Sequence, residues 1–314
     1  MKFSNTTKLV LTNFSNVWKL LLYYTICTVL GFFALYALVK PIWLKLDDAR
    51  VFVELEIWFN ALFSKPEGIA TSLNDILITI GQVLGANADT LLLNYIFTLA
   101  LIFIILPFMY SLSDLAVGEV LYGYMTSQTP YSFTGSYFRK FGKSVLYSLA
   151  KLPFEVFSKV LLVLLLVGVI KIWALGGILC VFLGGIVFLA TLVYVAFKVT
   201  MFTCWMPAIA VNDIGVYKAM RMGFATVFRN FWSTFSNAIV LVFCALVVNF
   251  FFAVFTFTVG LIITLPLTLY AFIVYGMVAY FSNQGMRFYV YPDMFVTPKR
   301  IKEQETITKL KFHI

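Results

Sequence analysis

Six long apolar stretches constrain this chain more than any other feature of its sequence. Each has about 20 residues or more, the length that an α-helix needs to cross the ~30 Å hydrocarbon core of a bilayer. They cover residues 17–39, 91–112, 153–173, 176–202, 232–257 and 261–281. The sequence therefore predicts an all-α, polytopic membrane protein with six transmembrane helices, and a break of the second helix near Pro107.

The composition excludes a typical soluble enzyme. Hydrophobic residues make up 62% of the chain and charged residues 12%, and the mean hydropathy is +0.95. The cysteines Cys27, Cys180, Cys204 and Cys244 lie in apolar stretches without a CxxC pair, and the one histidine is His313, so no disulfide, metal site or cofactor is predicted. The net charge of +9 is assigned to the flanks of membrane spans rather than to nucleic-acid binding.

The charges outside the spans predict the orientation. The N-terminal segment counted through Lys19, the loops after spans two and four, and the tail at 283–314 hold sixteen basic and six acidic residues. The insert at 40–90 holds four basic and seven acidic residues, and its periodicity predicts helices at 48–64 and 72–84. Because cytoplasmic segments are enriched in Lys and Arg, we expect a cell-membrane protein with both termini cytoplasmic and an extracytoplasmic helical insert.

The stretch from Asn212 to Phe235, between the fourth and fifth spans, has the pattern of an amphipathic helix. Its apolar side chains fall within one arc and its cations on the opposite side. The apolar set is Val216, Met220, Phe224, Val227 and Phe231, and the cations are Lys218, Arg221 and Arg229. Asn212 and Asp213 are the expected caps of its first turn. We expect a cytoplasmic elbow, a helix on the membrane surface whose cations contact anionic lipid.

Two other stretches resemble this elbow. Residues 138–141 (FRKF) resemble 228–231 (FRNF), and 13–18 resemble 230–235. The pattern favours three units, each an elbow followed by a helical hairpin, and Arg139, Lys140 and Lys143 of the second elbow are further candidates for headgroup contact. The alternative, that any basic and aromatic elbow looks alike, stays open.

Glu155 and Lys159 are the ionisable residues of most interest within a span. They lie four residues apart near one end of span three, so they share a helix face and are able to pair. An intramembrane charge is by default a candidate substrate or proton site. A mutual ion pair near the interface, with Lys159 reaching toward water, is the simpler interpretation.

Motifs of soluble enzymes fail on inspection. Gly142-Lys143-Ser144 resembles the end of a phosphate-binding loop, but six residues lie between Gly135 and Gly142 where the motif requires four. The sequence contains neither HExxH nor GxSxG. These observations predict no catalytic residue.

At the elbows the chain resembles the YesL-like membrane proteins of Gram-positive bacteria. It is similar in the same way to the membrane domain attached to some bacterial glycerophosphodiester phosphodiesterases. The resemblance is carried by residues 13–19, by 137–141 and, over the longest match, by 206–213 (MPAIAVND) with Ala219 and the elbow through Trp232. It implies an all-helical bundle with no assigned reaction, and the insert at 40–90 and the tail near 298–300 depart from it.

These observations favour a non-enzymatic membrane protein acting as a scaffold, an accessory subunit or a lipid-organising factor. Its expected partners are anionic membrane lipids, with a protein partner or a second copy of the chain as further candidates. A transporter or permease subunit, moving a small solute or lipid and using Glu155 and Lys159, is the alternative. An intramembrane enzyme comes third, since the sequence offers no pair of nucleophile and base.

Overall fold

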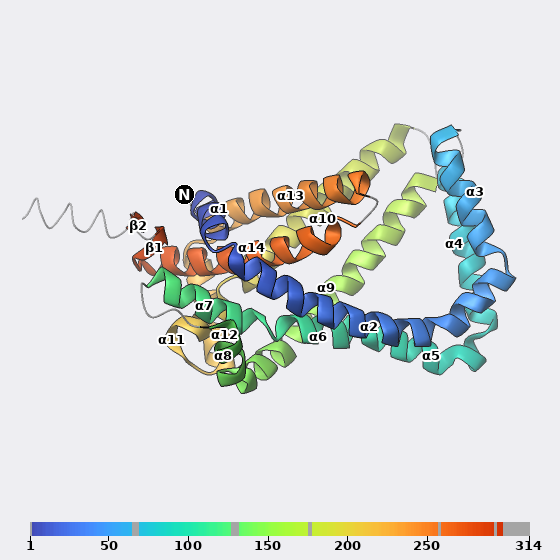
Figure 1. Ribbon diagram of the computed structural model, residues 1–314. Coiled ribbons are helices and arrows are strands. Elements are labelled where there is room, and N and C mark those ends of the chain that lie inside the picture. Colours follow the sequence, from blue (N-terminus) through green and yellow to red (C-terminus); the bar gives the residue numbers. More distant parts are fainter. Residues whose placement is uncertain are drawn as a thin grey trace, which may run out of the picture. The chain divides into compact units, whose positions relative to one another are not determined.

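The computed structural model describes residues 2–64, 69–126, 132–174, 178–256, 259–291 and 294–297 (Figure 1). Within these ranges, six helices are long and apolar enough to cross a membrane. They run over Ser15–Asp48, Ala88–Met125, Phe141–Ile172, Phe182–Asn212, Phe231–Phe255 and Leu261–Gln284. The chain is therefore an all-α, multi-pass membrane protein, as its apolar stretches predict.

The individual helices are shorter than these spans where the backbone breaks. The first are α1 (Lys2–Thr12), α2 (Ser15–Asp48), α3 (Val51–Ser64), α4 (Ile69–Ala86), α5 (Ala88–Ala100), the π-helix η1 (Leu101–Ile105), α6 (Leu106–Ser111) and α7 (Asp114–Met125). The others are α8 (Phe133–Arg139), α9 (Phe141–Ala174), α10 (Ile178–Phe202), α11 (Trp205–Asn212), α12 (Val216–Arg229), α13 (Phe231–Phe255) and α14 (Leu261–Gln284). Two strands, β1 (Phe288–Tyr291) and β2 (Met294–Val296), follow.

Several spans extend beyond their apolar stretches. Helix α2 continues through Pro41 to Asp48, so the first residues of the predicted insert belong to the helix of span one. Helix α9 begins at Phe141, twelve residues before the predicted start at Pro153. An apolar stretch identifies only the part of a helix that lipid can surround. It does not reveal the polar residues that continue the same helix.

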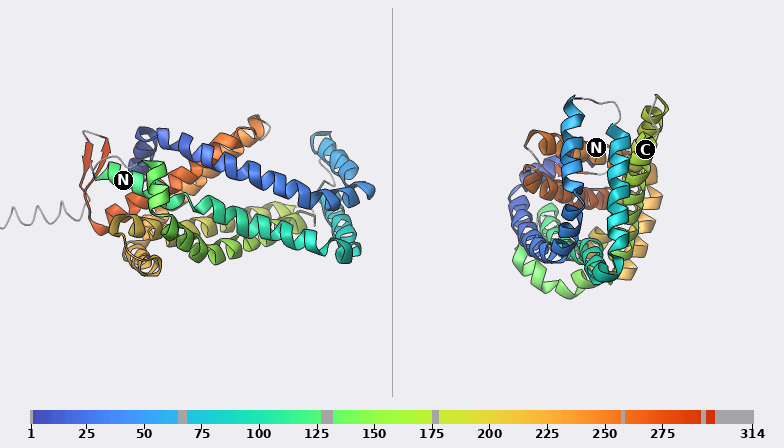
Figure 2. Two further views of the ribbon diagram at one scale, coloured as in Figure 1. Left: turned by 60° about the horizontal axis from the view of Figure 1, so that its bottom comes forward. Right: turned by 90° about the vertical axis from the view of Figure 1, so that its right-hand side faces the viewer.

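The chain divides into two compact units. The second unit comprises residues 27–108 and 151–191. Its insert is a pair of contacting antiparallel helices, α3 and α4, which Figure 2 shows side by side. Arg50 turns the chain from α2 into α3 with a left-handed φ of 58°, and Trp43 stacks on Phe52 across this turn, with ring centroids 3.9 Å apart.

The break predicted near Pro107 takes the form of the π-helix η1, which ends one residue before Leu106-Pro107. A π-turn absorbs one extra residue and so accommodates the hydrogen bond that proline lacks. Nearby, Asn94 Nδ2 donates to the carbonyl of Leu38 at 3.0 Å and ties α5 to α2. Neutral amides commonly make such bonds between membrane helices.

The first unit comprises residues 1–26, 109–150 and 192–314, and helix α11 lies at its centre. All residues from Trp205 to Ala210 are buried, and α11 contacts α7, α12 and α14. Pro207 lies in the first turn of α11, where the backbone N–H has no intrahelical acceptor, so this proline begins a helix as well as separating it from α10.

A glycine stands at each of these three contacts with the α11 region. A Cβ on Gly118 of α7 would collide with Met206 Sδ, and one on Gly276 of α14 would lie 2.6 Å from the carbonyl oxygen of Thr203. A Cβ on Gly223 of α12 would lie 3.0 Å from the backbone nitrogen of Trp205. Gly276 therefore approaches the backbone before α11 more closely than a Cβ allows, Gly223 leaves little room, and a Cβ on Gly118 would require the flexible Met206 side chain to move.

The segments before span one and after span six are not wholly polar extensions. Helix α1 packs on α13, α14 and β1 and buries Leu9 completely. The antiparallel hairpin β1–β2 buries alternate residues, Phe288 and Val290, in the core of the first unit. The structured part of the predicted tail thus belongs to the core, and residues 298–314 lie outside the described residues.

A lysine lies inside this core. Lys2 is 9% exposed, and its Nζ donates to Asn283 Oδ1 at 2.7 Å and to Thr234 Oγ1 at 3.0 Å. Asn283 Nδ2 also donates to Thr234 Oγ1, at 3.2 Å, so α1, α13 and α14 meet in one polar network. Both acceptors of the ammonium are neutral, and burial lowers the pKa of Lys2 from 10.5 to about 8.

This burial makes a prediction about pH. Because the folded-state pKa of Lys2 lies below its unfolded value, the unfolded chain binds more protons between pH 8 and pH 10.5, and folding becomes more favourable across that window. Relative to Lys2→Met, which keeps the volume and removes the charge, the wild type should gain up to about 3 kcal/mol. Thermal unfolding in detergent at pH 7.5 and pH 10.5 measures this; a wild type and variant that respond alike to pH would contradict it.

Candidate functional site

The predicted elbow at 212–235 is a shorter helix than its sequence pattern indicates. Helix α12 begins after Gly215, its N-cap, and ends at Arg229, and the backbone turns at Asn230 before α13. The expected capping by Asn212 and Asp213 is wrong: Asn212 ends α11, and Asp213 follows it with a left-handed φ of 52°. Asn212 Nδ2 instead donates to Tyr280 Oη at 2.6 Å, which fixes this turn to α14.

The inner face of α12 packs on protein. Val216 and Val227 of the predicted apolar arc are in the core of the first unit, whereas Met220 and Phe224 are half-buried. Trp205 Nε1 donates to the carbonyl of Val216 at 3.0 Å and so fastens the start of α12 to α11. The apolar arc therefore does not lie in lipid over its whole length, because α11 covers part of it.

The outer face of α12 is cationic and aromatic. The three predicted cations, Lys218, Arg221 and Arg229, are all exposed. Tyr217 and Phe228 of the same helix are exposed by 68% and 64%, although large aromatic side chains usually avoid water. At 100° per residue, these five side chains span about one third of the helix circumference, with the aromatics along one border and the cations toward the other.

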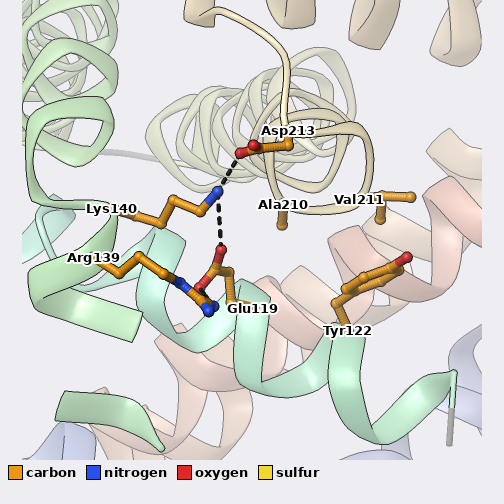
Figure 3. A pocket seen from close by; sticks show the side chains of 7 residues that line it. All are labelled: Glu119, Tyr122, Arg139, Lys140, Ala210, Val211 and Asp213. Atoms are coloured by element: carbon orange, nitrogen blue, oxygen red, sulfur yellow. Dashed lines mark hydrogen bonds and ion pairs between the residues drawn. The ribbon is translucent and has the colours of Figure 1, made fainter. Parts of the chain in front are cut away.

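A second cluster of charges joins α7, α8, the start of α9 and the turn after α11. Figure 3 shows Glu119 of α7 and Asp213 on either side of Lys140. Glu119 is 5% exposed; it accepts from Arg139 at 2.7 Å and lies 3.4 Å from Lys140. Lys140 also pairs with Asp213, and Lys143 Nζ reaches the Asp213 carboxylate at 2.8 Å. Three cations thus share two carboxylates.

Asp213 is the most exposed member of this cluster, with 65% of its side chain accessible. Hydrogen bonds from Lys140 and then Lys143 lower the pKa of its carboxyl from 3.8 to about 2. Since the folded-state pKa is depressed, the contribution of this carboxylate to stability is present above about pH 4 and is lost as the pH falls toward 2. At neutral pH, the side chain is an anion held by two ammonium groups.

The cluster forms the wall of a pocket of about 270 Å³. Its lining consists of Glu119, Tyr122, Arg139, Lys140, Ala210, Val211 and Asp213 (Figure 3). This volume is slightly below the ~300–1,000 Å³ typical of pockets for drug-sized ligands, so it suits a small polar group. Among the described residues, no three His, Cys, Asp or Glu side chains gather where they could hold a metal ion.

The predicted intramembrane pair lies in the second unit. Glu155 Oε1 is 3.8 Å from Lys151 Nζ, one turn earlier on α9, and Lys159 is half-buried one turn later. Lys151 is therefore a third charged residue beside Glu155 and Lys159, the two that the sequence singles out. The six predicted headgroup cations fall instead into two groups: Lys218, Arg221 and Arg229 on the open face of α12, and Arg139, Lys140 and Lys143 in the ion-pair cluster.

Sequence reasoning misses the anionic half of the cluster. Glu119 is 20 residues from Arg139, and Asp213 is 73 residues from Lys140, so no local spacing connects them. The usable signal is a glutamate in the middle of the apolar segment 115–125, because a carboxylate in such surroundings requires a cationic partner.

No family model, no curated protein and no solved structure matches this chain.

Proposed function

We propose that this integral membrane protein is a non-enzymatic lipid-organising or accessory factor that holds anionic headgroups on the outer face of α12. The observation that carries this proposal is that face: three exposed cations beside two exposed aromatic rings. Aromatic side chains prefer the level of the lipid headgroups, and Lys and Arg beside them attract anionic lipid by about 1 kcal/mol each. Trp232, 77% exposed just beyond α12, extends the same pattern.

The orientation belongs to the proposal. The excess of Lys and Arg in the segments that hold the elbows supports a cytoplasmic location for α12 and for both termini, and an extracytoplasmic location for α3 and α4. The resemblance to YesL-like proteins is compatible with this arrangement. Labelling of single cysteines in a cysteine-free variant tests this orientation. A cysteine in α4 that reacts only from the cytoplasmic side would show that the orientation is the opposite one.

The lipid proposal makes a direct prediction. Lys218→Gln/Arg221→Gln/Arg229→Gln should retain several-fold less anionic lipid than the wild type after gentle purification, as counted by native mass spectrometry, because the ~3 kcal/mol of attraction is removed. A matched control replaces Lys8, Lys19 and Arg287, three cations outside the α12 face, with glutamine. Equal lipid retention in the wild type and the α12 variant would refute the proposal.

The alternative, a transporter or permease subunit, draws on a different observation in the second unit. Lys151, Glu155 and Ser158 follow one another at helical spacing on α9, and the Ser158 hydroxyl is buried with no hydrogen-bond partner among the described residues. Charged and unsatisfied polar groups within a span favour a solute or proton path. If that path exists, Glu155→Gln should abolish proton flux into vesicles that hold a pH-sensitive dye; wild-type vesicles without flux would remove this support.

A further inference from the structure

The cationic pocket of the first unit is filled in part by a side chain of the chain itself. The Asp213 carboxylate accepts from Lys140 and Lys143, yet 65% of the Asp213 side chain is open to solvent. Glu119, by contrast, is buried beneath Arg139 and Lys140 and is a permanent part of the wall. The exposed carboxylate is therefore the member of the cluster that an external anion can replace.

The turn that carries Asp213 is held without its carboxylate. The backbone N–H of Asp213 donates to the carbonyl of Ile209 at 2.9 Å, and the neighbouring Asn212 is bonded to Tyr280. Lys143 Nζ also donates to the backbone oxygen of Asp213, at 2.7 Å. Release of the side chain from the lysines thus leaves the backbone of the turn supported.

The charges left behind favour an oxyanion. Without the Asp213 carboxylate, Glu119 is the one carboxylate left in the cluster of Arg139, Lys140 and Lys143, so the excess of positive charges rises from one to two. Lys143 lies in the first turn of α9, where the helix dipole adds positive potential. Tyr122 brings a phenol to the opposite side of the pocket (Figure 3). Two ammonium groups, a guanidinium and a hydroxyl are the donors that recognise phosphate.

We propose that this pocket is a phosphate site and that Asp213 is its tethered competitor, which an incoming phosphate group displaces from Lys140 and Lys143. The site deepens the proposed lipid function, on which it rests for the identity of its ligand: a phosphate of an anionic phospholipid headgroup. Free phosphate has the same chemistry, and the test separates the two sources.

Asp213→Asn is the decisive variant. Asparagine adopts the left-handed conformation readily, so the turn is kept while the competing charge is lost. If Asp213 occupies the lysines about nine-tenths of the time, its removal tightens the apparent affinity for phosphate groups about tenfold. The matched control, Asp75→Asn, removes a carboxylate from α4 in the other unit and should change nothing.

The experiment titrates the purified full chain in detergent with a short-chain phosphatidylglycerol and, separately, with inorganic phosphate, and it follows the Kd by calorimetry. Tighter binding of phosphatidylglycerol to Asp213→Asn supports the proposal with a lipid ligand. Tighter binding of inorganic phosphate alone supports the site but assigns it to free phosphate.

Unchanged or weaker binding of both by Asp213→Asn would overturn the proposal. So would a gain that persists in Asp213→Asn/Lys143→Gln, which lacks one of the two lysines. Failure of this site is distinct from failure of the lipid function, because the latter is measured by lipid retention in the α12 variant, whose pocket residues are intact.

Discussion

Replacing Gly276 with alanine is expected to destabilise the protein by about 2–3 kcal/mol, the size of a typical overpacking penalty. The new Cβ would lie 2.6 Å from the carbonyl oxygen of Thr203, an atom of the backbone that no change of rotamer can move aside. Helix α14 would have to withdraw from the start of α11, which is the centre of the core. Thermal unfolding in detergent, followed by the fluorescence of a thiol-reactive dye, measures the loss.

Gly142→Ala is the matched control for this substitution. Gly142 also lies in a helix of the first unit, but an added Cβ meets no atom within 4 Å. Because alanine is the better helix former by about 1 kcal/mol, this variant should be as stable as the wild type or more so. If both variants unfold at the wild-type temperature, the close approach of α14 to the α11 region is wrong.

Removal of the buried carboxylate should have a still larger effect. Glu119→Gln keeps the shape of the side chain but removes the carboxylate that Arg139 and Lys140 share, so that Lys140 retains only Asp213. We expect a loss of about 3–4 kcal/mol, the lower part of the range for breaking a buried ion pair, because Arg139 is half-exposed. Arg139→Gln should cost less, because 51% of the Arg139 side chain is exposed and Lys140 remains beside Glu119.

The order of these two variants tests the cluster. Thermal unfolding in the same detergent should place Glu119→Gln below Arg139→Gln, and Arg139→Gln below the wild type. The opposite order would show that Glu119 does not hold the cluster together.

The spans are the part of the fold that the sequence predicts well. Each needs only a run of apolar residues of sufficient length, a property that depends on lipid and not on any other part of the chain. The helical character of the insert follows similarly from local periodicity, as α3 and α4 show. The sequence therefore predicts the structural features that depend on lipid or on residues nearby in the chain.

The packing of the core of the first unit cannot be predicted from such local patterns. Lys2, Asn5 and Thr6 lie on the buried face of α1, where a search for apolar periodicity finds polar residues. Helix α11 contains a proline, and β1 and β2 are only four and three residues long. These elements are determined by contacts between distant segments, such as that of Lys2 with Asn283, and those contacts leave no local pattern.

The candidate site also contains both features that the sequence predicts and features that it does not. The cations of α12 could be assigned to one exposed face, since helical spacing alone determines it. The ion pairs of Lys140 and Lys143 with Asp213 could not, because they depend on how α9 meets the turn after α11. Helical spacing likewise predicts the apolar arc of α12, but that α11 covers part of this arc depends on contacts between helices.

The depth of α12 in the membrane shows directly whether its outer face contacts lipid headgroups. A spin label on Ala225→Cys, an exposed position of α12, would be placed in a variant whose native cysteines are alanine, reconstituted into vesicles of phosphatidylglycerol and phosphatidylcholine. Power-saturation spectroscopy compares its collisions with oxygen, which enriches in lipid, and with a water-soluble nickel chelate. If the outer face of α12 contacts headgroups, the label lies at headgroup depth and moves toward water when Lys218, Arg221 and Arg229 become glutamine. A label that collides freely with the nickel chelate in the unsubstituted elbow would rule out this contact.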